Sequence, residues 1–100
     1  MAAIPLPSLA IDGTERIVAA NAEALTLIGQ QAIGRNYVTI LRQPALLDAI
    51  ESTLSDSTAR TTRYLSNDGA QDTTFRVSCR AVPGVGARGA VVLSFEDISH

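Results

Sequence analysis

The segment from Ala10 to Gly34 constrains the fold more than any other part of the chain. An apolar stretch, Ser8–Ile11, runs into an Asp12-Gly13 pair, which is a strong signal for a tight turn between antiparallel strands. The next stretch, Arg16–Ala20, has the composition of a strand that returns beside the first. The sequence therefore predicts a β-hairpin close to the start of the chain.

Asn21 changes the pattern from strand to helix. Its side chain can accept a hydrogen bond from a free amide of the first helical turn, which contributes about 1 kcal/mol. Glu23 in that turn suits the positive end of the helix dipole. We expect a helix over Ala22–Ile28 that ends at Gly29, where glycine suits the left-handed conformation of a helix C-terminus.

A second helix is expected in the middle of the chain. Residues 30–41 look irregular, with short helical turns and a break at Gly34. Pro44 then suits the first position of a helix, and apolar residues recur at three- and four-residue spacing as far as Leu54. The spacing predicts an amphipathic helix over Pro44–Leu54.

The second half of the chain has the alternation of strands. Strands are expected over Ala59–Leu65, Thr73–Val82 and Ala90–Ile98, with turns at Asn67-Asp68-Gly69 and at Pro83–Gly86. The apolar faces of the last two strands consist of Phe75, Val77, Cys79 and Ala81, and of Val91, Leu93 and Phe95. We therefore predict an α+β fold, with helices inserted between the second and third strands of one antiparallel sheet and covering one face.

Composition limits the chain to a single globular domain, residues 1–100. The hydrophobic content of 46% and the charged content of 18% are those of a folded protein rather than a disordered one. A net charge of −2 gives no broad attraction to nucleic acid or to an anionic membrane surface. The apolar stretches fall short of the ~20 residues of a membrane span, and the N-terminus lacks the basic region of a secretory signal. We expect no direct membrane contact for this segment.

No catalytic or metal site is expected. The one cysteine, Cys79, lies on the apolar face of its strand without a histidine to activate it, so a structural thiol is favoured over a nucleophile. The only histidine is the last residue, His100, which argues against a metal or haem site. The carboxylates are scattered through turns and exposed helix faces, with no credible acid/base couple.

Four arginines could form a basic patch on the outer face of the sheet, namely Arg60, Arg63, Arg76 and Arg80. Solvated side chains paired with Asp or Glu are the favoured interpretation. The absence of base-stacking aromatic residues beside these arginines argues against single-stranded nucleic acid.

Apolar side chains of the helical insert and the sheet could line a small-molecule pocket. The same side chains could fill a solid core, which we favour. The candidates are Ile33, Ile40, Leu46, Leu47, Ile50, Leu54, Phe75, Val77, Leu93 and Phe95.

Three stretches resemble the PAS family. The Asp-Gly turn, the strand Arg-Ile-Val-Ala-Ala-Asn and the helix end Leu-Thr-Leu-Ile-Gly resemble the N-terminal PAS signature. The closing Leu-Ser-Phe-Glu-Asp-Ile-Ser, residues 93–99, resembles the Asp-Ile-Thr ending of PAS domains. Residues 41–50 resemble the corresponding helix in PAS domains of phosphate-regulon-type sensor histidine kinases.

The resemblance implies a five-stranded antiparallel sheet in the order 2-1-5-4-3. It also implies a non-catalytic, homodimeric regulatory module in the cytoplasmic part of a two-component sensor histidine kinase, which can be anchored in the inner membrane. Such a module passes conformational change to a linker helix and kinase core of the same chain, and through them to a response regulator. The coupling residues would be Glu96, Asp97, Ile98 and Ser99, with Asp97 at the hinge. The alternatives are a metabolite-binding PAS sensor and a PAS domain of another signalling protein, such as a transcriptional regulator.

The resemblance does not extend to a cofactor. Gly34-Arg35-Asn36 resembles the start of the flavin-binding loop of light-sensing PAS relatives, in which a cysteine follows. Here Tyr37 follows, and a phenol cannot form the photoadduct. Neither flavin nor haem is expected. Candidate dimer contacts are the outward Val92 and Ile98 and the segment Ile4–Leu9.

Overall fold

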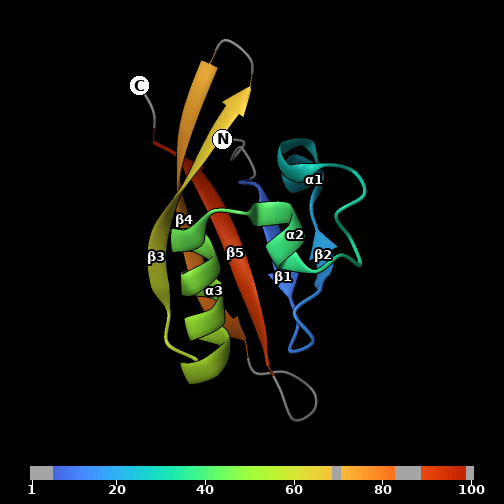
Figure 1. The fold of residues 1–100 in the computed structure, drawn as a ribbon, viewed down its shortest axis with the longest axis vertical. Coiled ribbons are helices and arrows are strands. Elements are labelled where there is room, and N and C mark those ends of the chain that lie inside the picture. Colours follow the sequence, from blue (N-terminus) through green and yellow to red (C-terminus); the bar gives the residue numbers. More distant parts are fainter. Residues whose placement is uncertain (1–5, 69–70, 83–88, 99–100) are drawn as a thin grey trace, which may run out of the picture.

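Residues 6–68, 71–82 and 89–98 are described by the structure, a computed structural model. Five antiparallel strands form one sheet in the order β2-β1-β5-β4-β3, and the helices cover one of its faces (Figure 1). The predicted fold class and strand order are confirmed. The strands are β1 (Ser8–Ile11), β2 (Ile17–Ala20), β3 (Arg60–Asp68), β4 (Gln71–Val82) and β5 (Ala90–Asp97), and the helices are α1 (Ala22–Ile28), α2 (Tyr37–Leu41) and α3 (Pro44–Asp56).

The β1–β2 hairpin is held at its turn by the carboxylate of Asp12. Its Oδ1 accepts a hydrogen bond from the amide of Thr14 at 3.0 Å, and the Glu15 amide donates to the Asp12 carbonyl at 2.9 Å. β2 begins at Ile17, one residue later than predicted, because Arg16 forms an isolated bridge with Asn36 instead of joining the strand.

The helix α1 has the predicted bounds. Asn21 is its N-cap residue, and the Asn21 Oδ1 accepts from the Ala24 amide at 2.9 Å. Gly29 ends the helix with φ +112° and ψ 144°, so it has the positive φ that glycine tolerates but not the left-handed helical conformation that was predicted.

The helix α3 begins at Pro44 as predicted and runs two residues beyond Leu54. The extra turn is stabilised by an ion pair between Asp56 and Arg60 at 2.9 Å. The hydrogen bond that Arg60 donates within this ion pair lowers the pKa of the Asp56 carboxyl group. Arg60 also donates to the hydroxyl of Thr53 at 3.1 Å, and Thr53 is fully buried. Arg60 therefore ties the end of α3 to the start of β3.

The β3–β4 hairpin is longer than predicted. Strand pairing continues to Asp68 and Gln71, so Asn67 and Asp68 are strand residues rather than turn residues, which corrects their predicted role; Gly69, the third residue of the predicted turn, lies outside the described residues. At the edge of the sheet, the side chain of Gln43 accepts from the Leu65 amide at 2.8 Å and donates to the Leu65 carbonyl at 2.5 Å. These bonds cover backbone groups that an edge strand otherwise exposes.

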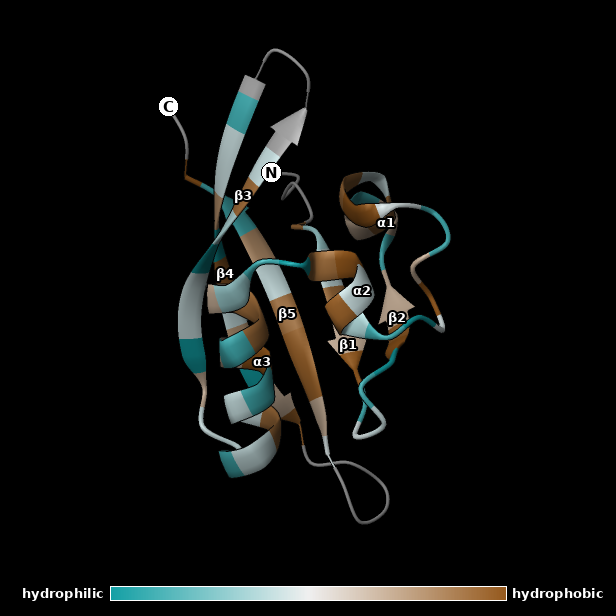
Figure 2. Ribbon diagram, in the orientation of Figure 1, coloured by the Kyte–Doolittle hydropathy of each residue, from teal (hydrophilic) through white to brown (hydrophobic). Residues whose placement is uncertain are grey.

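The core lies between the helices and the inner face of the sheet. Val91, Leu93 and Phe95 of β5 are fully buried, as are Val77 and Cys79 of β4, which confirms the predicted inner face of β5 and the middle of that of β4. Phe75 is partly buried and packs against this core, and Ala81 is partly exposed. Figure 2 shows the apolar stretch of β5 running behind the helices. The part of the chain that the structure describes contains no helix long and apolar enough to cross a membrane.

Candidate functional site

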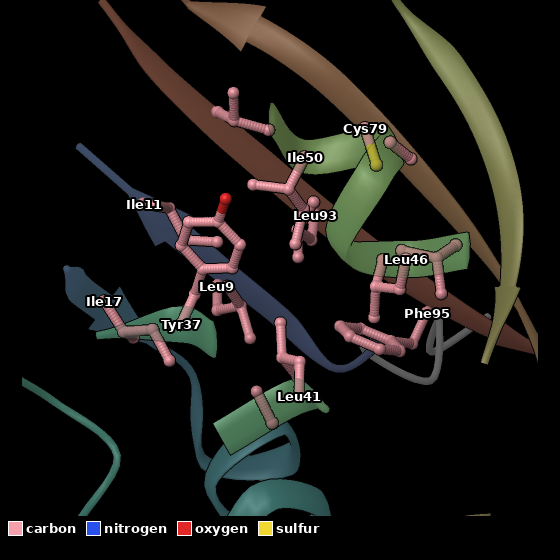
Figure 3. Packing of buried hydrophobic residues seen from close by; sticks show 14 of the residues in the cluster. Leu9, Ile11, Ile17, Tyr37, Leu41, Leu46, Ile50, Cys79, Leu93 and Phe95 are labelled. Carbon is pink, nitrogen blue, oxygen red and sulfur yellow. The ribbon is translucent and has the colours of Figure 1, made fainter. Parts of the chain in front are cut away.

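Most of the predicted pocket residues meet in the core. Leu46, Ile50, Val77, Leu93 and Phe95 are fully buried. Ile40, Leu47, Leu54 and Phe75 are partly buried and pack against this cluster. Figure 3 shows Leu46, Ile50, Leu93 and Phe95 within the core. Phe95 makes edge-on contacts with Tyr64 and Phe75, with ring centroids 5.6 and 6.1 Å apart. These side chains pack against one another between the sheet and the helices.

Ile33 does not join the cluster and is 46% exposed, which corrects its assignment as a pocket residue. The reason is the turn that contains it. The Ala32 amide donates to the Gly29 carbonyl at 3.3 Å, and the Arg35 amide donates to the Ala32 carbonyl at 3.0 Å. This turn directs Ala32, which is 1% exposed, into the core and leaves Ile33 outside.

A hollow of about 480 Å³ opens at the edge of the core, between the β1–β2 turn, the start of α2 and the second half of α3. Of the ten predicted pocket residues, only Leu54 borders it. The lining consists of Gly13, Glu15, Tyr37, Glu51, Leu54, Ser55, Ser57 and Gly89. Sequence reasoning missed this site because its polar residues come from three separate segments.

Tyr37 is the most buried polar residue of this hollow, with 3% of its surface exposed. Asn36 caps α2 by accepting from the Val38 amide at 2.9 Å, and the Tyr37 amide donates to the Glu15 carbonyl at 3.0 Å. Figure 3 shows the Tyr37 ring beside Ile11 with its hydroxyl directed away from Leu41. Burial raises the pKa of Tyr37, and the charges of Glu15 and Glu51 raise it further.

One of the four arginines of the predicted basic patch, Arg60, does not lie on the outer face of the sheet. Arg60 lies opposite Cys79 in the strand register and faces the helices, so it does not belong to the outer face. Arg63 and Arg76 are exposed cross-strand partners on that face. Arg76 also forms an ion pair with Glu96 at 3.2 Å, in agreement with the favoured interpretation of charge-paired side chains.

Cys79 is fully buried, and burial raises the pKa of its thiol to about 11. A nucleophilic cysteine requires the opposite shift and an exposed sulfur. The described residues include no group of three or more His, Cys, Asp or Glu side chains that could hold a metal ion.

The low reactivity of the Cys79 thiol can be tested by measuring its rate of reaction with dithiobis(nitrobenzoate). At a pH of about 8, a thiol with a pKa of about 11 is ~0.1% thiolate. We expect the native protein to react at least ~100-fold more slowly than the protein unfolded in guanidinium, because burial also blocks the reagent. Equal rates in the two states would contradict the burial of this thiol.

The chain leaves the sheet through residues of the predicted coupling segment. Glu96 pairs with Arg76 on the outer face, and the Ile98 amide donates to the Thr74 carbonyl at 2.9 Å. Asp97 is exposed at the end of β5, in register with Phe75. Ser99 and His100 lie outside the described residues, as do the turn at Pro83–Gly86 and the first two positions of Ile4–Leu9.

The outer face carries a shallow hollow of about 270 Å³ over β1, β2 and β5. Val92, one of the predicted dimer contacts, lines it together with Ala10 and Ala19. Ile98, another of these contacts, is half-buried beyond the end of β5.

Several solved structures share this arrangement. A sensory box sensor histidine kinase from Vibrio cholerae matches 97% of this chain and 84% of its own, with a TM-score of 0.73 and 14% identity. The PAS domain of BvgS from Bordetella pertussis matches 96% of this chain and 79% of its own, with a TM-score of 0.71 and 13% identity. A PAS-B domain of the Drosophila melanogaster protein Cycle with bound glycerol matches 93% of this chain and 100% of its own, with a TM-score of 0.67 and 13% identity. No protein-family model and no curated protein matches the sequence.

Proposed function

From the PAS fold that this chain adopts, we propose that it is a regulatory and dimerisation module of a two-component sensor histidine kinase. The module has no catalytic role of its own. It acts on a kinase core in the same parent chain, which is the histidine phosphotransferase, and through that core on a response regulator. We place it in the cytoplasm, without nucleic acid, flavin or haem as a partner.

The position of β5 is the observation that carries this proposal. β5 lies between β1 and β4 in the middle of the sheet, and it pairs with β4 along its whole length and with β1 over Val91–Ser94. The strand ends at Asp97 and is followed directly by Ile98. A rearrangement on either side of the sheet would therefore move the segment that follows β5, which is where a linker helix to the kinase core would begin.

Contacts with β4 make the end of β5 and Ile98, which we call the exit of the sheet, sensitive to how the strands pack. The Arg76–Glu96 ion pair and the hydrogen bond from Ile98 to Thr74 join the exit to β4. The ion pair is exposed, so it contributes little to stability. Two arrangements of this exit that differ by a few kcal/mol would be enough to bias a kinase.

The test replaces Asp97 with alanine in the full-length parent protein. We expect an altered rate of autophosphorylation with an unchanged melting temperature of the domain, because Asp97 is exposed and lies at the end of β5. Asp48→Ala is the matched control, since Asp48 is an exposed carboxylate on α3, far along the chain from the exit. Identical autophosphorylation by the Asp97→Ala and parent proteins would contradict the proposed coupling.

The proposed homodimer would use the outer face of the sheet. The apolar hollow that Val92 lines supports this choice, because an exposed apolar patch on a sheet favours association. Ile98 and the residues Leu6–Ser8 of the N-terminal segment are further candidates for the contact, whereas Leu9 is 2% exposed and belongs to the core, which removes it from the predicted contact.

A second candidate function is that of a small-molecule sensor with the same fold. The observation that favours it is the polar hollow beside Tyr37, whereas most of the apolar candidate residues pack against one another in the core. The two functions are compatible, since a bound molecule can supply the signal that the kinase module transmits.

A further inference from the structure

We propose that the side chain of Gln43 keeps β3, the outermost strand of the sheet, from pairing with β3 of a second copy of this chain. The surface concerned is the open edge of β3, by which we mean the side of the strand that faces away from β4. This edge is distinct from the outer face of the sheet, which the proposed homodimer would use. The inference therefore goes beyond the proposed function.

The open edge of β3 is long and regular. β3 is the last strand in the sheet order, so among the described residues it pairs with β4 alone. That pairing runs without a register shift from Arg60 to Asp68. In such a ladder, successive residues direct their backbone N–H and C=O groups alternately toward the neighbouring strand and away from it. Every second residue of β3 therefore offers both groups to a further strand.

Leu65 is one of the residues whose backbone groups point to the open edge, and Gln43 binds both of these groups. The Gln43 Oε1 accepts from the Leu65 amide at 2.8 Å, and the Gln43 Nε2 donates to the Leu65 carbonyl at 2.5 Å. A strand beside β3 would make the same two bonds with its own carbonyl and amide groups. The side chain of Gln43 thus takes the place that a residue of a neighbouring strand would take.

The backbone around Gln43 holds its side chain at this edge. Gln43 precedes Pro44, which favours an extended conformation, and its φ of −106° and ψ of 121° are extended. It is also the N-cap residue of α3, yet its side chain makes no capping hydrogen bond to that helix. Figure 1 shows the connection from α2 to α3 leading toward the side of the sheet on which β3 lies. The side-chain amide of Gln43 is therefore available to β3.

The sequence of β3 indicates which pairing Gln43 blocks. Antiparallel pairing of two β3 strands can be centred on Arg63 or on Leu65, the residues near the middle of the strand whose backbone groups point to the open edge. A centre at Arg63 would place two arginines directly opposite each other, where like charges repel. A centre at Leu65 would pair two apolar side chains that are each 63% exposed, with Arg63 opposite Asn67. This second register is the favourable one, and it needs the backbone groups that Gln43 occupies.

Analytical ultracentrifugation of the 100-residue chain and of its Gln43→Ala variant tests the proposal. The substitution frees the Leu65 backbone groups, so we expect the variant to form a species of at least twice the wild-type mass with a Kd of about 0.1 mM or lower. The wild-type chain should form this species at least about tenfold more weakly. Each mass is compared with that of the wild-type chain, so the test applies equally to a monomer and to a dimer through the outer face.

Further variants locate the contact. Gln31→Ala is the matched control, because it removes an exposed glutamine from the turn after α1, outside α3 and β3, and it should leave the mass unchanged. Combining Gln43→Ala with Leu65→Lys should restore the wild-type mass, since two lysines would meet at the centre of the pairing. Gln43→Asn, whose amide is one methylene shorter in reach, is expected to associate like Gln43→Ala. NMR spectra at low concentration that match the wild-type spectrum establish that each variant is folded.

Hydrogen exchange gives a measurement that is specific to strand pairing. In the wild-type chain, the Leu65 amide should be protected by its bond to Gln43, whereas the Arg63 amide at the open edge should exchange fast. In Gln43→Ala, the Arg63 amide should gain protection as the protein concentration rises, because a second β3 strand would supply its acceptor. Association through another surface would not protect this amide.

Three results would overturn the proposal. They are equal masses of the wild-type and Gln43→Ala chains up to about 1 mM, association of the Leu65→Lys double variant as strong as that of Gln43→Ala, and exchange of the Arg63 amide that is independent of concentration. The autophosphorylation test with Asp97→Ala does not depend on these outcomes, so this proposal and the proposed function can fail separately.

Discussion

Replacing Phe95 with alanine is expected to lower the free energy of unfolding by about 3–5 kcal/mol. Phe95 is fully buried at the centre of the aromatic cluster and contacts Tyr64 and Phe75 edge-on. The substitution removes a large apolar surface and leaves a cavity that the neighbouring strands cannot close without losing their pairing. Because β5 pairs on both sides, the sheet has little freedom to collapse around the gap.

The measurement is urea denaturation followed by far-UV circular dichroism. The control is Leu65→Ala, because Leu65 is also apolar and lies on a strand but is 63% exposed. We expect the control to change stability by no more than about 0.5 kcal/mol. A Phe95→Ala protein that unfolds at the same urea concentration as the Leu65→Ala protein would contradict the packing described for the core.

Replacing Asn21 with alanine is expected to cost about 2–3 kcal/mol, more than a simple helix cap. Its Oδ1 accepts from the amides of Ala24 at 2.9 Å and Ser8 at 3.0 Å, and its Nδ2 donates to the Leu6 carbonyl at 2.8 Å. The substitution therefore uncaps α1 and also frees the segment that enters β1.

The matched comparison is Asn36→Ala. Asn36 caps α2 through one side-chain hydrogen bond, to the Val38 amide at 2.9 Å, so its loss should cost only about 1 kcal/mol. Hydrogen exchange adds a local measurement, because the Ser8 and Ala24 amides should lose protection in Asn21→Ala. Equal destabilisation by the two substitutions would show that Asn21 acts as a cap alone.

Local chemistry was enough to predict most of the elements. Asn21 and Gly29 bound α1, Pro44 begins α3, and the two-residue alternation of β4 and β5 separates inner from outer side chains. These signals act between neighbours in the chain, so they can be read without knowing the fold. The errors lie at ends of elements, where longer-range contacts compete. The ion pair between Arg60 and Asp56 stabilises the last residues of α3, which therefore ends at Asp56. Pairing with β4 makes Asn67 and Asp68 part of β3.

The candidate hollow could not be predicted in the same way. Glu15, Tyr37 and Glu51 belong to a turn and two helices, and nothing in their spacing indicates that they meet. From the sequence, Tyr37 is distinguished only by standing where light-sensing PAS relatives have a cysteine. Tyr37 is buried and also lines the hollow because its amide bonds to Glu15 and so fixes α2 against the β1–β2 turn.

The sequence by itself determined the order of the elements, the caps and the apolar faces, including the placement of Cys79 on one of them, because these follow from residue type and local spacing. Only the tertiary structure decided which side chains meet. It assigned Arg60 to the helical face, left Ile33 outside the core and placed Gln43 against Leu65. Such contacts join residues far apart in the chain, and a shift of one residue in a turn or strand reverses the direction of a side chain.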